Sequence, residues 1–257
     1  MSLERSLFLT RIFISFSFLV QSFEFLALAN TIHSSSPWSW DIVRMDFVNW
    51  PKIALKFLDS IYKTRFRFLI YLHLLFILLL NLKYNWLIPL TLIITNLLIC
   101  FRFRGSFNGG SDYMTMTVLM GLTFSSVDNT NSNTIKLGLY CIAFQCTFSY
   151  FIAGFVKLKN QGWRSGLALK SFLLHSNYLV PRQMKILSKS ELIIKISTWA
   201  IILWEITFPI IWLIPKITIP ALIVAFGFHL GNYFTFGLNR FVFAWLACYP
   251  AIIFCTQ

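Results

Sequence analysis

Residues 198–213, TWAIILWEITFPIIWL, are apolar and rich in aromatic side chains, and Glu205 is their only charged residue. With its flanks this stretch forms a segment, 192–214, that is long enough to cross the hydrocarbon core of a bilayer as a helix. Similar apolar segments recur along the chain, at 7–29, 66–82, 86–103, 113–126, 135–156, 217–236 and 241–254. This recurrence predicts an all-α integral membrane protein, a polytopic bundle of seven or eight transmembrane helices.

The composition supports this fold class. Of the 257 residues, 57% are hydrophobic and only 12% are charged, whereas a soluble domain contains about 25% charged residues. We therefore expect a single transmembrane domain over residues 1–257 and no separate soluble domain. The first apolar segment is not followed by a convincing cleavage site, so we expect it to be retained as a helix rather than removed as a signal peptide.

The basic residues indicate a membrane partner. The formal net charge is +13, but Lys and Arg lie mainly at the ends of apolar segments, where they anchor to lipid headgroups. The lipid bilayer of the cell membrane is therefore the expected partner, and nucleic acid is not. Basic, amphipathic stretches lie at 56–68 and 162–175. The first suits a helix that lies at the headgroups or leads into the next apolar segment, and the second suits a helix in the interface plane. Positive charge gathers after the first, third and fifth segments, which predicts that these connections face the cytoplasm and both termini face outside.

Glu205 lies near the middle of its apolar segment. A charged carboxylate at that depth costs at least ~2.5–3.5 kcal/mol on insertion scales. It must therefore be paired, be protonated or face a wet cavity. By default such a residue indicates a functional site, and the alternative is a protonated glutamate that bonds a neighbouring helix.

A second polar group lies in the segment 217–236. His229 and Asn232 are three residues apart, so they share one face of a helix, and unpaired imidazole and amide groups in hydrocarbon cost several kcal/mol each. Both should face the interior of the bundle, and Glu205 is a plausible partner for His229. Arg240 follows the helix-ending FGL and is expected at the next interface as a headgroup anchor.

Lys157 lies where the segment 135–156 meets the interface. A lysine there can extend its ammonium group to the headgroups. Partial dehydration disfavours the charged form of a lysine, so the alternative is that Lys157 acts as a base. The sequence does not predict a metal site, because its five cysteines form no CxxC pair and no His/Cys cluster has zinc spacing.

Two stretches together resemble a known family. YFIAGFVKLKNQGW (150–163) and FHLGNYFTFGLNRFVFAWLACYP (228–250) are similar to the vitamin K-dependent γ-carboxylase-like membrane domain, also called the horizontally transferred transmembrane (HTTM) domain. The positions that match its pattern are Ala153, Gly154, Lys157, Leu158, Trp163, Gly166, Phe228, His229, Asn232 and Phe236. Glu205 also matches an acidic residue that is frequent in the equivalent helix of that family.

The resemblance implies a chemistry. In the carboxylases, the lysine that matches Lys157 deprotonates vitamin K hydroquinone, oxygen adds, and the resulting alkoxide abstracts a γ-proton from a peptide glutamate before CO2 is captured. By this resemblance Lys157 is the candidate base and His229 and Glu205 are further catalytic candidates, in a pocket with Asn232, Trp163 and Arg240. The implied cofactor is a lipid-soluble, vitamin K-like quinol, and the implied partner is a secreted peptide or protein.

Other functions remain open. Where the family places a histidine, this sequence has Ser111 and Asp112, and the carboxylases carry a large region beyond the membrane domain. In size the chain is nearer to relatives of the sporulation-delaying protein B, which resemble accessory membrane proteins that mature or export a peptide toxin. A non-catalytic maturation factor is therefore the alternative function. A small transporter with Glu205 and His229 as a proton relay ranks last, because no inverted repeat is visible.

Overall fold

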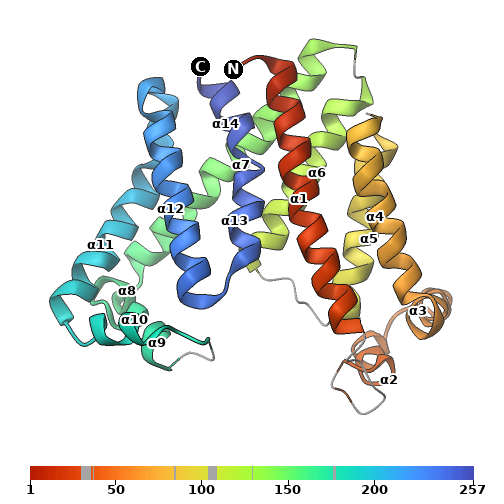
Figure 1. Ribbon diagram of the computed structural model, residues 1–257, viewed down its shortest axis with the longest axis horizontal. Coiled ribbons are helices and arrows are strands. Elements are labelled where there is room, and N and C mark those ends of the chain that lie inside the picture. Colours follow the sequence, from red (N-terminus) through yellow and green to blue (C-terminus); the bar gives the residue numbers. More distant parts are fainter. Residues whose placement is uncertain (30–35, 37, 84, 104–108, 129, 176–177) are drawn as a thin grey trace.

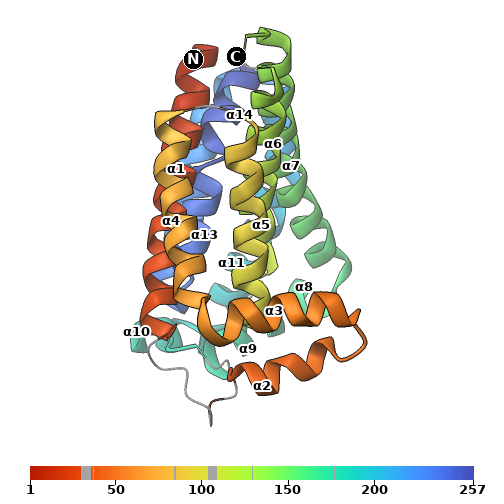
Figure 2. The same cartoon turned by 90° about the vertical axis from the view of Figure 1, so that its right-hand side faces the viewer.

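The computed structural model describes residues 1–257 except 30–35, 37, 84, 104–108, 129 and 176–177. The described residues form helices and turns and contain no strand. The long helices stand side by side in one bundle (Figures 1 and 2). The predicted fold class, an all-α membrane protein, is therefore confirmed.

Each predicted apolar segment lies in a helix or in two consecutive helices. The corresponding elements are α1 (Leu3–Ala29), α4 (Phe66–Leu82), α5 (Leu87–Arg102), α6 (Gly109–Val127), α7 (Ser132–Lys159), α11 (Glu191–Thr207), α12 (Thr218–Phe236), α13 (Asn239–Leu246) and α14 (Tyr249–Thr256). The connection between α5 and α6 falls largely on 104–108, outside the described residues.

The number of spans differs from the prediction of seven or eight. Among the described residues, five helical segments are long and apolar enough to cross a membrane: Leu3–Ala29, Ser132–Lys159, Glu191–Trp212, Pro215–Phe236 and Asn239–Thr256. The count is six if the bent pair α3 (Lys52–Thr64) and α4 is taken as one span. The helix α5 is apolar but only 16 residues long. The predicted count is therefore not confirmed.

Proline and glycine set the ends and breaks of the last spans. The helix α11 continues as a 3₁₀ helix, η2 (Phe208–Trp212), at Pro209, because proline cannot donate an amide hydrogen bond within a helix. A short 3₁₀ turn, η3 (Pro215–Ile217), leads into α12. Gly237 has φ 71° and ends α12 in the left-handed conformation, and Pro250 lies in the first turn of α14. The predicted end of a helix at FGL is therefore confirmed.

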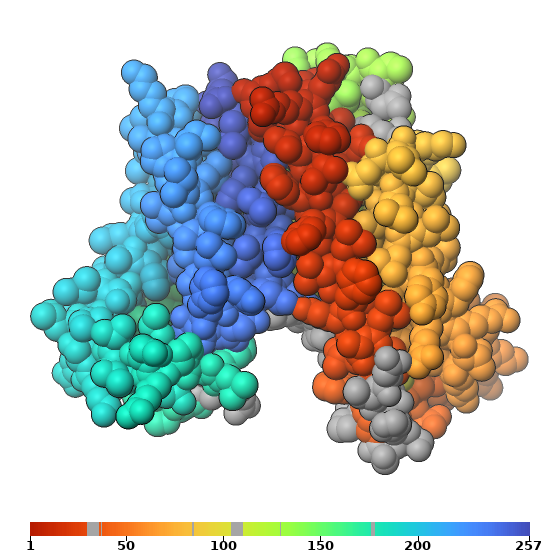
Figure 3. Space-filling view, viewed as in Figure 1, coloured from red at the N-terminus to blue at the C-terminus, as the bar shows by residue number. Residues whose placement is uncertain are grey.

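Short helices gather at the end of the bundle that is opposite the termini (Figure 1). They are α2 (Trp40–Val43), η1 (Arg44–Phe47), α3, α8 (Gln161–Arg164), α9 (Leu167–His175) and α10 (Arg182–Leu187). They form two lobes with a recess between them (Figure 3). The helix α3 makes an angle of 89° with α4, as expected for a helix that lies along the headgroups.

The predicted helix over 162–175 is in fact two helices. Gly166 separates α8 from α9 and has φ 85°, a conformation that residues with a Cβ rarely adopt. The amphipathic pattern alone did not reveal this break, because Gly166 lies within an otherwise continuous helical spacing.

The two termini lie together at one end of the bundle (Figure 1). The amino group of Met1 donates a hydrogen bond to Oε1 of Gln257, at 2.7 Å. The topology deduced from the positive charges also has both termini on one side of the membrane. That this side is the outside remains a prediction.

Candidate functional site

Lys157 and Glu205 form an ion pair between α7 and α11. The Nζ atom of Lys157 donates to Oε1 of Glu205 at 2.8 Å and to Oε2 at 2.7 Å. The Glu205 side chain is 3% exposed and that of Lys157 is 17% exposed. The carboxylate is therefore paired within the protein, which is one of the three states that its depth in an apolar segment requires.

The close packing of α7 on α11 makes this pair possible. A Cβ atom at Gly154 would lie 2.8 Å from Cβ of Glu205 and 2.8 Å from the backbone nitrogen of Ile206. Glycine fits here without a shift of its neighbours, because real Cβ atoms essentially never approach another heavy atom closer than 3.0 Å. Gly154 is one turn from Lys157 on α7, so the same contact brings the lysine beside the carboxylate.

The end of α7 places Trp163 against the pair. The helix extends to Lys159, beyond the predicted end at 156, and the Asn160 side chain then accepts hydrogen bonds from the amides of Gly162 and Trp163. This N-cap starts α8 and turns the chain back. The Trp163 ring consequently lies 5.3 Å from Nζ of Lys157, within the range of a cation–π contact.

His229 has a different partner from the one expected. Its Nε2 atom lies 2.8 Å from the hydroxyl oxygen of Tyr150, whereas Glu205 is bonded to Lys157. The predicted pairing of Glu205 with His229 is therefore not observed. The Nδ1 atom of His229 and the Nε1 atom of Trp245 are buried without a hydrogen-bond partner among the described residues.

A cavity of about 510 Å³ joins these groups. Its volume falls within the range of about 300–1,000 Å³ that is typical of small-molecule sites. The cavity wall is rich in aromatic rings, from Tyr113, Tyr150, Trp163, Phe172, Tyr178, Phe228, Phe236, Phe241 and Trp245. Its polar side chains are Thr117, Gln145, Ser149, Lys157, Glu205, His229 and Asn232, together with the hydroxyls of the tyrosines.

Five of the six candidate residues from the sequence therefore line one cavity: Lys157, Trp163, Glu205, His229 and Asn232. They come from α7, α8, α11 and α12. The structure shows their proximity, and the chemical role of each remains a proposal. Among the described residues, no group of three or more His, Cys, Asp and Glu side chains is placed to hold a metal ion.

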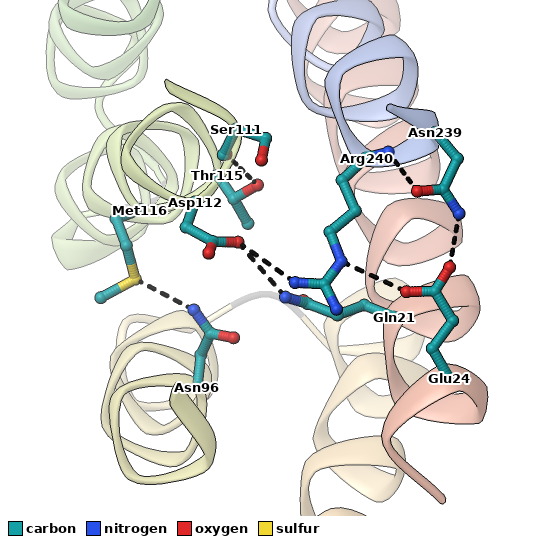
Figure 4. A network of polar contacts seen from close by, with 9 residues as sticks. All are labelled: Gln21, Glu24, Asn96, Ser111, Asp112, Thr115, Met116, Asn239 and Arg240. Atoms are coloured by element: carbon teal, nitrogen blue, oxygen red, sulfur yellow. Dashed lines mark hydrogen bonds and ion pairs between the residues drawn. The ribbon is translucent and has the colours of Figure 1, made fainter. Parts of the chain in front are cut away.

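Arg240, the sixth candidate, does not line this cavity. It belongs to a second polar network in which its guanidinium lies between Glu24 of α1 and Asp112 of α6 (Figure 4). Its Nε atom is 3.2 Å from Oε2 of Glu24, and Nη1 is 4.0 Å from Oδ1 of Asp112. The Asp112 carboxylate also accepts from Nε2 of Gln21, at 3.4 Å, and Asn239 donates to Glu24. Arg240 thus connects three helices of the bundle rather than contacting the cavity.

Several residues of the site escaped the sequence analysis. Tyr150 and Gln145 carry no charge and lie in an apolar segment, and Trp245 looks like an ordinary aromatic core residue. A signal was present on α7, because Tyr150, Gly154 and Lys157 follow the spacing i, i+4, i+7 of one helix face. Following this helix face from Lys157 toward the N-terminus identifies Tyr150.

The chain matches a known protein family. The sequence model of a family described as the HTTM domain matches residues 111–257, which is more than half of the chain and includes every residue that lines the cavity except Gly110. No curated protein and no solved structure matches the chain.

Proposed function

The chain belongs to the HTTM domain family of carboxylase-like membrane proteins, and from this membership we propose that it is an enzyme of the cell membrane that modifies a secreted peptide or protein. In this proposal Lys157 and Glu205 accept a proton from a lipid-soluble quinol. The main support is that Lys157, Trp163, Glu205, His229 and Asn232 line one aromatic cavity.

The cavity fits a quinol ring. Flat aromatic ligands pack well against aromatic side chains, and Trp163, Phe228 and Trp245 are part of its wall. His229 and Trp245 also belong to this wall, and each has a buried ring nitrogen without a hydrogen-bond partner among the described residues. A bound quinol supplies an acidic hydroxyl group and reducing electrons, from which a strong base can arise with oxygen.

The Lys157–Glu205 pair can hold a proton in two ways. In the ion pair, the ammonium group donates to both carboxylate oxygens. Transfer of one proton from Nζ to Glu205 leaves a neutral amine and a neutral carboxylic acid. Two neutral groups are easier to accommodate in apolar surroundings than an unpaired charge. The lone pair of the amine is then available to remove a proton from a hydroxyl group in the cavity.

Other residues of the cavity position the substrate. The bond between Tyr150 and His229 fixes the plane of the imidazole ring, and Asn232 lies one helical turn from His229 on α12, with an amide that can donate and accept. The aromatic wall excludes water from the hydroxyl group, which strengthens its hydrogen bonds to these side chains.

A direct assay tests the proposed function. The full chain in phospholipid nanodiscs is incubated with menadiol, a glutamate-containing peptide and labelled bicarbonate, and label in the peptide is measured. We expect quinol-dependent label that is lost in Lys157→Ala and kept in Lys159→Ala, because Lys159 is exposed and does not line the cavity. Label that persists in Lys157→Ala would overturn the assigned role of the lysine.

The same ion pair also favours a second function. Both oxygens of Glu205 are bonded to Lys157, so the pair can have a purely structural role and hold α7 on α11. In that case the protein is a non-catalytic factor that matures or exports a secreted peptide. That function predicts normal peptide production in any folded variant that lacks the amine of Lys157. A proton-relay transporter gains no support, because Glu205 and His229 have separate partners.

A further inference from the structure

We propose that the cavity opens sideways into the bilayer between α6 and α7, and that Gln145 at this mouth binds the polar head of a lipid-borne ligand. This inference deepens the proposed function, on which it rests. It names the class of ligand, an amphipathic molecule with a hydroxyl or carbonyl head and an apolar tail, and the route by which it reaches Lys157.

The two helices touch closely on one side of this mouth. A Cβ atom at Gly121 of α6 would overlap Ile142 of α7, and one at Gly138 of α7 would overlap Oγ of Ser125 and the Gly121 carbonyl oxygen. The helices therefore cross at Gly121 and Gly138 with their backbones in near contact.

Away from this crossing, α6 and α7 pack against different helices. Toward its end at Lys159, α7 packs on α11 through Gly154. Toward its start, α6 packs on α13, where a Cβ at Gly110 would lie 3.0 Å from the Phe241 ring and 3.1 Å from the Trp245 ring. The slant of α7 away from α6 is visible in Figure 1. The cavity occupies the space between the diverging halves, with walls from both helices.

Exposed side chains mark the mouth. Tyr113 of α6 lines the cavity and is 66% exposed. Gln145 of α7 also lines the cavity and is exposed, while Thr117 and Ser149 are half-buried beside them. Since these residues belong to helices that cross the membrane or lie within the bundle, the exposed mouth faces lipid.

Gln145 is an unusual residue for this position. It lies at the middle of the 28-residue helix α7, where the surroundings are hydrocarbon, and its amide makes no hydrogen bond to any residue that the structure describes. An amide without a partner in such surroundings costs roughly 2 kcal/mol or more. A hydroxyl or carbonyl group of a ligand at the mouth would satisfy it.

A path leads from Gln145 to the ion pair. Gln145, Ser149, Ala153 and Lys157 all line the cavity, and their spacing of four residues places them along one face of α7. This face covers about 18 Å at 1.5 Å per residue. Two polar side chains and a small one thus guide a polar head toward Lys157, while an apolar tail stays among the lipids.

Photolabelling tests this route without a quinol or a measurement of catalysis. The full chain is placed in phosphatidylcholine nanodiscs with a long-chain alcohol that carries a diazirine next to its hydroxyl group, and labelled residues are identified after illumination. We expect label on Trp245, which lines the cavity and is only 6% exposed. Label confined to lipid-facing residues such as Phe144 and Phe148 would overturn the proposal.

Three variants sharpen the result. Ser149→Trp should plug the mouth and lower the labelling of Trp245 about tenfold, while Gln145→Leu removes one hydrogen-bonding partner and should lower it roughly two- to tenfold. Phe144→Leu changes a neighbouring residue that is 62% exposed and does not line the cavity, so it should have no effect. Unchanged labelling in folded Ser149→Trp and Gln145→Leu contradicts the route. Labelling as expected with no quinol-dependent modification would leave the route intact and reject the proposed enzyme.

Discussion

The Nζ atom of Lys157 lies 2.8 Å from Oε1 and 2.7 Å from Oε2 of Glu205, so one ammonium group faces both oxygens of a buried carboxylate. Removal of one partner from a buried pair leaves an unpaired charge and typically costs about 3–5 kcal/mol. The pair therefore holds α7 on α11 in addition to its proposed part in proton transfer. A variant that separates these two roles must keep a positive charge beside Glu205.

Gly154→Ala should disturb the pair without changing either of its members. The added methyl group would meet Cβ of Glu205 and the backbone of Ile206 at 2.8 Å, and such overpacking costs about 1–3 kcal/mol. We expect a lower thermal stability and a loss of quinol-dependent activity, measured on the purified protein in nanodiscs.

Gly227→Ala is the matched control for that substitution. Gly227 lies inside α12, and a Cβ there meets nothing within 4 Å. Since alanine favours a helix over glycine by about 1 kcal/mol, this variant should be as stable as the wild type or more stable. An equal loss of stability in both variants would contradict a specific contact at Gly154.

Tyr150→Phe should weaken binding in the cavity. It removes the hydroxyl that bonds Nε2 of His229 at 2.8 Å and leaves a buried imidazole nitrogen without a partner, at a cost of about 1–3 kcal/mol. We expect lower stability and weaker quenching of tryptophan fluorescence by menadione. Tyr140→Phe, on an exposed position of the same helix, should change neither quantity. Equal quenching in Tyr150→Phe and the wild type would exclude a role for this bond in the site.

The fold could be predicted from the sequence because lipid imposes a simple rule. Every backbone amide in hydrocarbon must be satisfied within its own segment, so apolar length predicts helices, and α4 begins and ends at the residues expected. This rule did not predict where α7 ends or that the chain breaks at Gly166. They depend on local features, the Asn160 cap and a positive φ, that change hydropathy little.

Some residues of the candidate site could also be predicted from the sequence, but their partners could not. The free-energy cost of placing a polar side chain in hydrocarbon was enough to indicate that Glu205 and His229 face inward. The structure places both at the cavity. Which group each contacts depends on how the helices are arranged around α7. Because α7 and α11 approach closely at Gly154, Glu205 bonds Lys157, and His229 bonds Tyr150 instead. A single sequence contains no signal for that arrangement.

Arg240→Met should loosen the bundle without affecting the chemistry of the cavity. It removes the cation between Glu24 and Asp112, which connects α1, α6 and α13 (Figure 4). We expect a lower free energy of unfolding, with partial recovery in the double variant Arg240→Met/Asp112→Asn, because asparagine no longer needs a cation. A coupling of about 0.5–3 kcal/mol is typical for residues in contact. Strictly additive effects would show that Arg240 and Asp112 act independently.

The most direct test of the central claim compares Lys157→Ala with Lys157→Arg in the quinol-dependent labelling assay. Arginine keeps a cation beside Glu205 but does not lose its proton, so Lys157→Arg should fold normally and be inactive. Loss of a general base lowers rates by about 10²–10⁴-fold, and added ethylamine should restore part of the activity of Lys157→Ala. Full activity in Lys157→Arg, or no rescue of a folded Lys157→Ala by any small amine, would contradict Lys157 as the base.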